Sequence, residues 1–193
     1  MMRCGCPEED QQQTPQSPGV VMPEESIVFA LVSPLTANAE SVAVLSKSRL
    51  KDRALSVCRG DYSSYEDLLQ HVVEPQLDGN DERDEQNKRI YRGYQWTSCE
   101  EIRKILADIA SSSRDNEPEV PLVGAFCVVD DAQPDYSSHA LVGYSRPENP
   151  KFWQKHDREA ARANLLVALQ RNGTIKPGDD HTNLSCWGAK RVA

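Results

Sequence analysis

The 193-residue sequence lacks the features that define several large classes of protein. No stretch approaches the roughly 18–20 uninterrupted apolar residues that a membrane-spanning helix needs, which predicts a protein that does not enter a membrane. Basic residues are in the minority, because 22 Lys and Arg stand against 30 Asp and Glu and the formal charge is −8. This balance excludes indiscriminate binding to nucleic acid, which requires a strongly basic surface.

Motifs for cofactors and metals are missing as well. The ten glycines are not clustered, and no phosphate-binding glycine loop, HExxH, GxSxG or EF-hand pattern occurs. Cys4 and Cys6 are separated by one residue, whereas the cysteines of structural zinc pairs are about two to four residues apart, and no second pair follows. We therefore predict that the protein binds no metal and no cofactor.

The use of cysteine predicts the compartment. The six cysteines are scattered, and residues 1–23 contain no apolar segment of the kind found in secretory signals. Scattered cysteines without such a signal are typical of reduced thiols. The sequence therefore predicts a cytoplasmic protein whose cysteines are free.

Apolar runs predict the strands of a single sheet. The predicted strands are residues 27–32, 54–58, 89–96, 120–129 and 138–145, while residues 41–45 are a strand or part of a helix. Residues 27–32 and 122–129 are apolar at both alternating sets of positions, so both faces of these strands must be covered by helices or by a second subunit. A homodimer is one way to provide that cover.

Three amphipathic helices are predicted around this sheet. The first begins at Ser63, which forms a capping box with Glu66, and ends before Pro75. The second, residues 97–110, begins at a similar pair, Thr97 and Glu100. The third, residues 149–171, begins at Asn149-Pro150 and ends at Asn172-Gly173, a dipeptide that favours a left-handed end.

Together these patterns predict an α+β fold with a mixed, partly antiparallel sheet. Residues 1–24 are rich in Gln, Pro, Ser and Glu and are predicted to form a disordered tail. Residues 25–175 form the single α+β domain, and residues 176–193 form an irregular C-terminal tail.

The third helix contains a candidate anion-binding surface. Four of its five basic residues are spaced so that they fall within a sector of roughly 60°, about 140° from the apolar stripe of the same helix. These residues, which we call the basic ridge, are Lys151, Lys155, Arg158 and Arg162. The ridge predicts contact with phosphate, a nucleic-acid backbone or an acidic protein, and the alternative is an ordinary solvated helix face.

The strand at residues 89–96 interleaves arginines with aromatic rings. Strand alternation places Arg92, Tyr94 and Trp96 on one face and Tyr91 on the other. Rings that stack on bases beside guanidinium groups that hold phosphates are typical of single-stranded nucleic-acid binding. Packing of the same rings under a helix is the alternative.

A third candidate site is a thiol nucleophile. Cys127 and His139 lie on the two strands of a predicted hairpin, with Asp130 and Asp131 at the turn. Cys127 faces His139 if the numbers of paired residues sum to 266, and a slip of one residue puts them on opposite faces. A cysteine in an apolar run is otherwise an inert core residue.

The sequence alone favours a binding function. An acidic chain without catalytic motifs is typical of a non-catalytic regulatory protein, of the inhibitor, immunity or accessory type, that contacts a macromolecule, chiefly a protein. The contact surfaces would be the acidic stretch at residues 78–85 and the basic ridge. The two alternatives are a nucleic-acid or phosphate-binding protein and a cysteine-dependent hydrolase or transferase.

Overall fold

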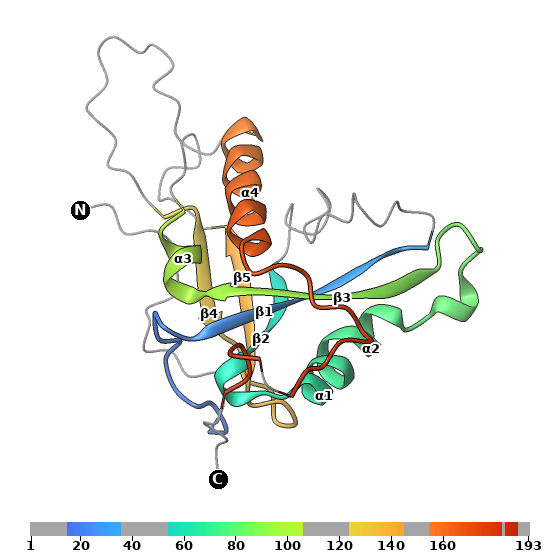
Figure 1. The fold of residues 1–193 in the computed structure, drawn as a ribbon, viewed down its shortest axis with the longest axis horizontal. Coiled ribbons are helices and arrows are strands. Elements are labelled where there is room, and N and C mark those ends of the chain that lie inside the picture. The colour runs from blue at the N-terminus through green and yellow to red at the C-terminus, as the bar shows by residue number, and fades with distance from the viewer. Residues whose placement is uncertain (1–14, 36–53, 106–123, 145–154, 183, 189–193) are drawn as a thin grey trace.

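A computed structural model describes residues 15–35, 54–105, 124–144, 155–182 and 184–188, apart from the side chains of residues 155–158. The fold is α+β, as predicted, with a five-stranded sheet in the order β3-β1-β2-β5-β4 (Figure 1). The strands are β1 (Ser26–Pro34), β2 (Leu55–Arg59), β3 (Arg89–Ser98), β4 (Phe126–Asp130) and β5 (His139–Tyr144). The helices are α1 (Tyr65–Leu68), α2 (Glu74–Leu77), α3 (Cys99–Arg103) and α4 (Lys155–Gln170).

Neighbouring strands of the described sheet are all antiparallel, so the mixed part of the prediction is wrong. The segment that carries α1 and α2 does join two parallel strands, β2 and β3. However, β1 lies between them and runs antiparallel to both. Alternation of helices and strands along the chain therefore does not produce a parallel ladder here.

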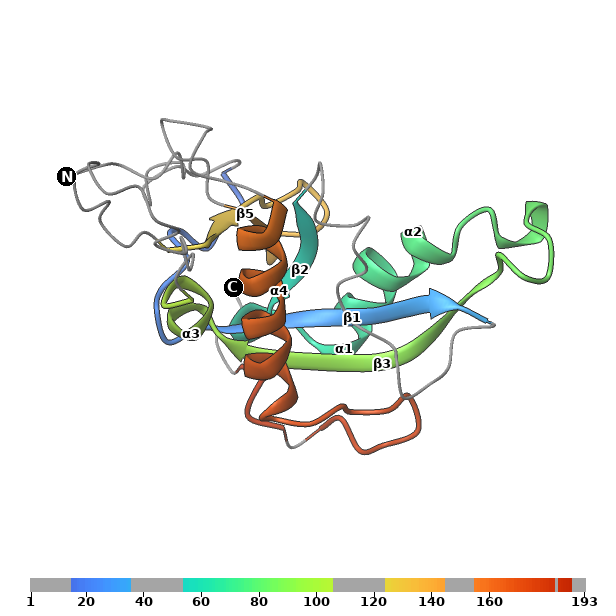
Figure 2. The same cartoon turned by 90° about the horizontal axis from the view of Figure 1, so that it is seen from above.

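Both faces of β1 are covered, as its continuous apolar pattern predicts. Ile27, Phe29 and Leu31 belong to one core cluster, and the alternate residues from Val28 to Val32 belong to another. Helices α3 and α4 lie on the first face, which we call the α4 face. Helices α1 and α2 lie on the opposite face, the α1 face, together with Ile175, Leu184, Cys186 and Trp187. Seen from above, α4 crosses in front of β1 and β3, and α1 lies behind them (Figure 2).

The first predicted helix differs in its start and in its end. The capping box is Ser64 with Asp67, one residue after the predicted pair. Pro75 does not stop the helix, because a π-helical turn at Leu69–Val73 precedes it and α2 begins at Glu74. The helix thus changes its hydrogen-bond pattern just before Pro75, which has no N–H to donate.

The other helices agree with the prediction in part. Helix α3 is capped by Ser98, one residue after the predicted Thr97, and ends at Arg103. The rest of the predicted second helix, residues 106–110, lies outside the described residues, as do residues 41–45 and the start of the third helix. Gly173 has a φ of 73°, and its N–H donates to the carbonyl oxygen of Gln170, which confirms the predicted left-handed end of α4. No helix in the described part of the chain is long and apolar enough to cross a membrane.

Candidate functional site

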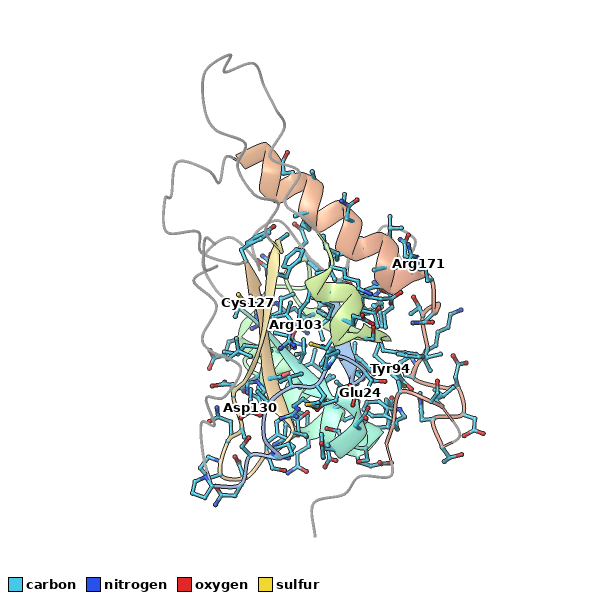
Figure 3. The ribbon with its side chains drawn as sticks, turned by 90° about the vertical axis from the view of Figure 1, so that its left-hand side faces the viewer. Glu24, Tyr94, Arg103, Cys127, Asp130 and Arg171 are labelled. Atoms are coloured by element: carbon cyan, nitrogen blue, oxygen red, sulfur yellow. The ribbon has the colours of Figure 1, made fainter. Side chains whose placement is uncertain are left out.

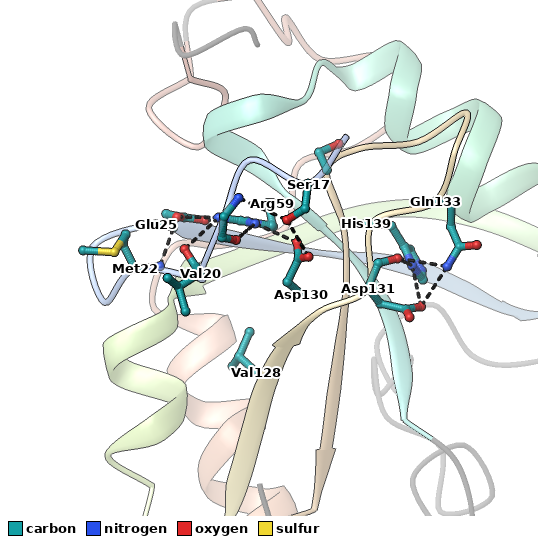
Figure 4. Close-up of polar contacts among 12 residues, drawn as sticks. Ser17, Val20, Met22, Glu25, Arg59, Val128, Asp130, Asp131, Gln133 and His139 are labelled. Carbon is teal, nitrogen blue, oxygen red and sulfur yellow. Dashed lines mark hydrogen bonds and ion pairs between the residues drawn. The ribbon is translucent and has the colours of Figure 1, made fainter. Parts of the chain in front are cut away.

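Two neighbouring carboxylates at the end of β4 make different contacts, because successive strand residues point to opposite faces. Asp130 lies beside the buried Arg59, and Asp131 lies beside His139 (Figure 4). His139 Nδ1 is 2.9 Å from Asp131 Oδ2 and 3.0 Å from the Asp131 carbonyl oxygen. The β4–β5 hairpin holds this pair together, since the Asp131 N–H also donates to the His139 carbonyl oxygen at 3.1 Å.

Ser56, on the neighbouring strand β2, contacts the other nitrogen of the same imidazole ring. The distance from Ser56 Oγ to His139 Nε2 is 2.5 Å. In the β2–β5 register Ser56 pairs with Leu141, so Ser56 and His139 lie diagonally on the same sheet face. Ser56 is exposed, and the side chains of His139 and Asp131 are 12% and 26% exposed. A small molecule can therefore reach the Ser56 hydroxyl.

The hydrogen bonds on the two ring nitrogens define the role of each side chain. Asp131 presents only acceptors to Nδ1, so Nδ1 is assigned the proton and donates it. Nε2 of the neutral ring is then free to accept the hydroxyl proton of Ser56. A chain of bonds from a hydroxyl to a histidine to a carboxylate is the arrangement that activates a serine nucleophile.

Further side chains hold His139 and Asp131 in place. The rings of Tyr136 and His139 have centroids 5.7 Å apart, and on its other side Tyr136 stacks on His71 with centroids 4.4 Å apart. Gln133 Nε2 donates to the Asp131 carbonyl oxygen at 2.9 Å and to Oδ2 at 3.1 Å. His139 and Asp131 are therefore both held in their orientations by neighbouring side chains.

The backbone of β2 offers a hydrogen-bond donor next to the Ser56 hydroxyl. The Arg59 N–H donates to the Ser138 carbonyl oxygen, toward β5. Along an antiparallel strand, successive N–H groups point to opposite neighbouring strands. Ser56 is three residues before Arg59, so its N–H is directed toward β1. Among the described strands the β1–β2 register ends at Val28–Cys58, two residues before Ser56. The described part of the β1–β2 pairing therefore does not include Ser56.

Cys127 is not brought to His139. Phe126 pairs with Tyr144, so the numbers of paired residues sum to 270, and Cys127 pairs with Gly143. Gly143 is four positions from His139 along β5, which is about 14 Å along a strand. Cys127 lies near the opposite end of β4 from Asp130 (Figure 3), is 8% exposed and is disulfide-bonded, contrary to the predicted free thiol. The predicted base is thus in contact with a serine from another strand.

The cysteines that are free in the structure, Cys58, Cys99 and Cys186, are buried. Burial raises the pKa of the Cys58 thiol to about 12 and that of Cys186 to about 11. Because the thiolate is the reactive form, we expect iodoacetamide at about pH 8 to leave both unmodified in the native protein and to alkylate both in guanidinium chloride. Peptide mass spectrometry measures this, and native labelling of either thiol would contradict the buried state.

The aromatic strand is placed differently from the prediction. Leu31 pairs with Gly93 and Val32 pairs with Tyr91, so Arg92 is the extra residue of a β-bulge. The bulge interrupts the alternation, and Tyr91 therefore packs on the α1 face with Tyr94 and Trp96. Arg92 instead donates to the Leu35 carbonyl oxygen at 3.2 Å and to the Ser33 hydroxyl at 3.3 Å.

Tyr94 is fully buried, so its ring has no face open to a nucleic-acid base. Its hydroxyl accepts a hydrogen bond from Trp187 Nε1 at 3.1 Å and lies 3.2 Å from His181 Nδ1. His181 also stacks on Tyr65, with ring centroids 3.6 Å apart. Burial raises the pKa of Tyr94 above its ordinary value. This cluster attaches the C-terminal segment to the α1 face.

The basic ridge lies mostly beyond the described side chains. Lys151 is outside the described residues, and the side chains of Lys155 and Arg158 are not described. Arg162 is half-buried on α4. The ridge therefore stays a prediction.

A second cluster of charges, around Arg59, is buried in the sheet. The Arg59 guanidinium donates to Glu25 through Nε and Nη2, both at 2.8 Å, and to Asp130 Oδ1 through Nη1 at 2.8 Å. Its remaining donors reach the carbonyl oxygens of Gly19 at 2.7 Å and Val20 at 3.1 Å. Arg59 and Glu25 are fully buried. All five donors of the guanidinium are used, so this cluster is structural and not a free anion site.

This cluster also holds part of the segment that was predicted to be a disordered tail. Residues 15–24 are described and run beside Arg59 (Figure 4). The Ser17 hydroxyl donates to Asp130 Oδ2 at 2.6 Å, and Val21 is buried in the core of the α4 face. The difference has a physical reason, because a buried guanidinium requires carbonyl acceptors and this segment supplies them.

The sequence does not single out Ser56. It lies in an otherwise apolar strand, between Leu55 and Val57, and its one signal is a small polar residue at a position where an apolar one would be expected. Such a serine is common in strands, so only its distance to His139 reveals a role. Among the described residues, no group of three or more His, Cys, Asp and Glu side chains is arranged to hold a metal ion.

Comparison with known proteins provides no family for the chain. No family model matches it, and neither the curated proteins nor the solved structures contain a match. The chemistry of the Ser56–His139–Asp131 site therefore has to be inferred from its own atoms.

Proposed function

We propose that this protein is a serine hydrolase or acyltransferase. In this proposal Ser56 is the nucleophile, His139 is the general base, and Asp131 orients His139. The observation that carries the proposal is the continuous pair of contacts at 2.5 Å and 2.9 Å on the two nitrogens of one histidine. Compared with the predicted cysteine-dependent hydrolase, this proposal has the same base, His139, but a different nucleophile, Ser56 instead of Cys127.

The first half of the reaction forms an acyl-enzyme. Ser56 Oγ attacks the carbonyl carbon of an ester as its proton passes to His139 Nε2. Asp131 stabilises the imidazolium that results. The C–O bond to the leaving alcohol then breaks, and His139 returns the proton to that alcohol.

The second half frees the serine. His139 takes a proton from water, or from an acceptor alcohol, as its oxygen attacks the acyl carbon. The bond between the acyl carbon and Ser56 Oγ breaks, and Oγ recovers the proton from His139. Water yields a carboxylic acid, and an alcohol yields a new ester.

An alkyl fluorophosphonate tests this proposal directly. Attack by Ser56 forms an Oγ–P bond and breaks the P–F bond, so that fluoride leaves and the hydroxyl proton passes to His139. We expect about one probe per chain, attached to the peptide that contains Ser56, as measured by intact-protein and peptide mass spectrometry. Ser56→Ala and His139→Gln should both abolish this adduct.

A matched control separates the site from general serine reactivity. Ser185 is exposed in the C-terminal segment, and Ser185→Ala should be labelled like the unchanged protein. An unlabelled Ser56, or labelling at the same rate in His139→Gln, would show that His139 does not activate Ser56.

The binding function favoured by composition is the second proposal. It is supported by the acidic stretch at residues 78–85, whose five carboxylates are all exposed. The basic side chains within and beside this stretch are engaged, because Arg83 donates to Asn80 Oδ1 and Lys88 pairs with Glu85. The surface thus presents net negative charge to a basic protein partner. The cytoplasmic location and the homodimer belong to this proposal.

A further inference from the structure

The sheet face that carries Ser56 also carries apolar side chains outside the core. Leu141 pairs with Ser56 on one side and with Val129 on the other, so the three side chains form one row across β2, β5 and β4. Leu141 and Val129 are both half-buried, and neither belongs to a core cluster. This row therefore presents apolar surface to solvent directly beside the serine hydroxyl.

The next row, on the side away from His139, consists of the small residues Ala54, Gly143 and Cys127. Gly143 has no side chain, and Cys127, with which it pairs, is 8% exposed and disulfide-bonded, so Gly143 is the open position of this row. A Cβ placed on Gly143 would lie 3.3 Å from the Cβ of Ala54, so Ala54 is the neighbour of this glycine on the β2 side. The two rows together make a low apolar surface, which we call the acyl floor.

We propose that the acyl floor, chiefly Leu141 and Val129, binds the unbranched apolar acyl chain of an ester whose carbonyl carbon is attacked by Ser56. This inference rests on the proposed serine mechanism and deepens it by naming the substrate class. An acyl chain that covers Leu141 and Val129 removes their apolar surface and its own from water, which favours binding.

The order of residues along β5 also orients the ester. Gly143, Leu141 and His139 follow one another on the same face of β5, and Leu141 pairs with Ser56, so the Gly143 end of the acyl floor and the general base lie on opposite sides of Ser56 along the strand. An acyl chain that runs from Leu141 toward Gly143 leaves the side toward His139 for the leaving alcohol. That is the direction in which His139 must return the proton.

A series of 4-nitrophenyl esters tests the acyl floor. Full burial of one methylene is worth about fourfold in affinity, and a surface that covers one side of the chain supplies about half of that free energy, which is about twofold per methylene. We expect kcat/KM to rise about 16-fold from the acetate to the hexanoate, which has four more methylenes. Leu141→Gln should reduce this ratio to less than about threefold, because it removes apolar surface beside Ser56.

Two further variants make the comparison decisive. Val129→Thr keeps the shape of the side chain on the edge strand and should also lower the ratio, which covers the case that Leu141→Gln does not fold. Val167→Asp changes an exposed apolar residue on α4, at the other face of the sheet, and should leave the ratio unchanged.

The outcomes distinguish the floor from the mechanism. A flat chain-length profile for the unchanged protein, with acetate hydrolysis still lost in Ser56→Ala, overturns the acyl floor and leaves the serine mechanism standing. A long-chain preference that persists in both floor variants also overturns the floor. The absence of any ester hydrolysis, together with no fluorophosphonate adduct, overturns both.

Discussion

Replacing Asp131 with Asn is expected to lower kcat/KM for ester hydrolysis by about 10²–10³-fold. An amide nitrogen facing Nδ1 of His139 favours the tautomer that carries its proton on Nε2, and this tautomer cannot accept the proton of Ser56. The loss should stay below the roughly 10⁴-fold known for such a change, because the Asp131 carbonyl oxygen at 3.0 Å still accepts from Nδ1. Steady-state hydrolysis of 4-nitrophenyl acetate, corrected for the rate of Ser56→Ala, measures the effect.

Asp135 provides the matched control for this change. It lies exposed in the same β4–β5 loop, and Asp135→Asn alters the total charge by the same amount. Its kcat/KM should stay within about twofold of the unchanged protein, because long-range charge effects are screened. Equal rates for the two Asn variants would remove Asp131 from the mechanism.

Replacing Arg59 with Met is expected to lower the free energy of unfolding by about 3–5 kcal/mol. Glu25 and Asp130 are buried and would keep their charges without a cation, which is the costly way to break a buried ion pair. The carbonyl oxygens of Gly19 and Val20 would also lose their donors. Since the whole stability of a domain is about 5–15 kcal/mol, this variant should be close to unfolding. Urea denaturation followed by circular dichroism measures the difference.

A surface arginine serves as the comparison for Arg59. Arg171 pairs with Glu101 at 3.3 Å, and both side chains are largely exposed. Arg171→Met should therefore cost no more than about 1 kcal/mol. A loss of that small size for Arg59→Met would mean that water reaches Glu25 and Asp130.

The sequence alone determines the local elements and the covering of the sheet. The apolar run at residues 27–32 has no polar side, so it must lie between two layers, and both core clusters do contain it. Turn residues between two apolar runs predict the β4–β5 hairpin, which brings Asp131 and His139 close together. The N-terminal starts of α1 and α3 are predicted to within one residue, because the bond made by a capping hydroxyl involves only neighbours in the chain.

The tertiary structure alone decides which side chains meet across strands that are far apart in the sequence. Ser56 reaches His139 because β2 pairs with β5 in one register, and a shift of one residue would place the serine on the other face. Register also decides the place of Cys127, which pairs with Gly143 and not with His139. A β-bulge likewise decides the place of Tyr91, because it turns this residue to the opposite face. Periodicity in a sequence specifies which face of a strand is buried. It does not specify register between strands, since that depends on the packing of the whole sheet.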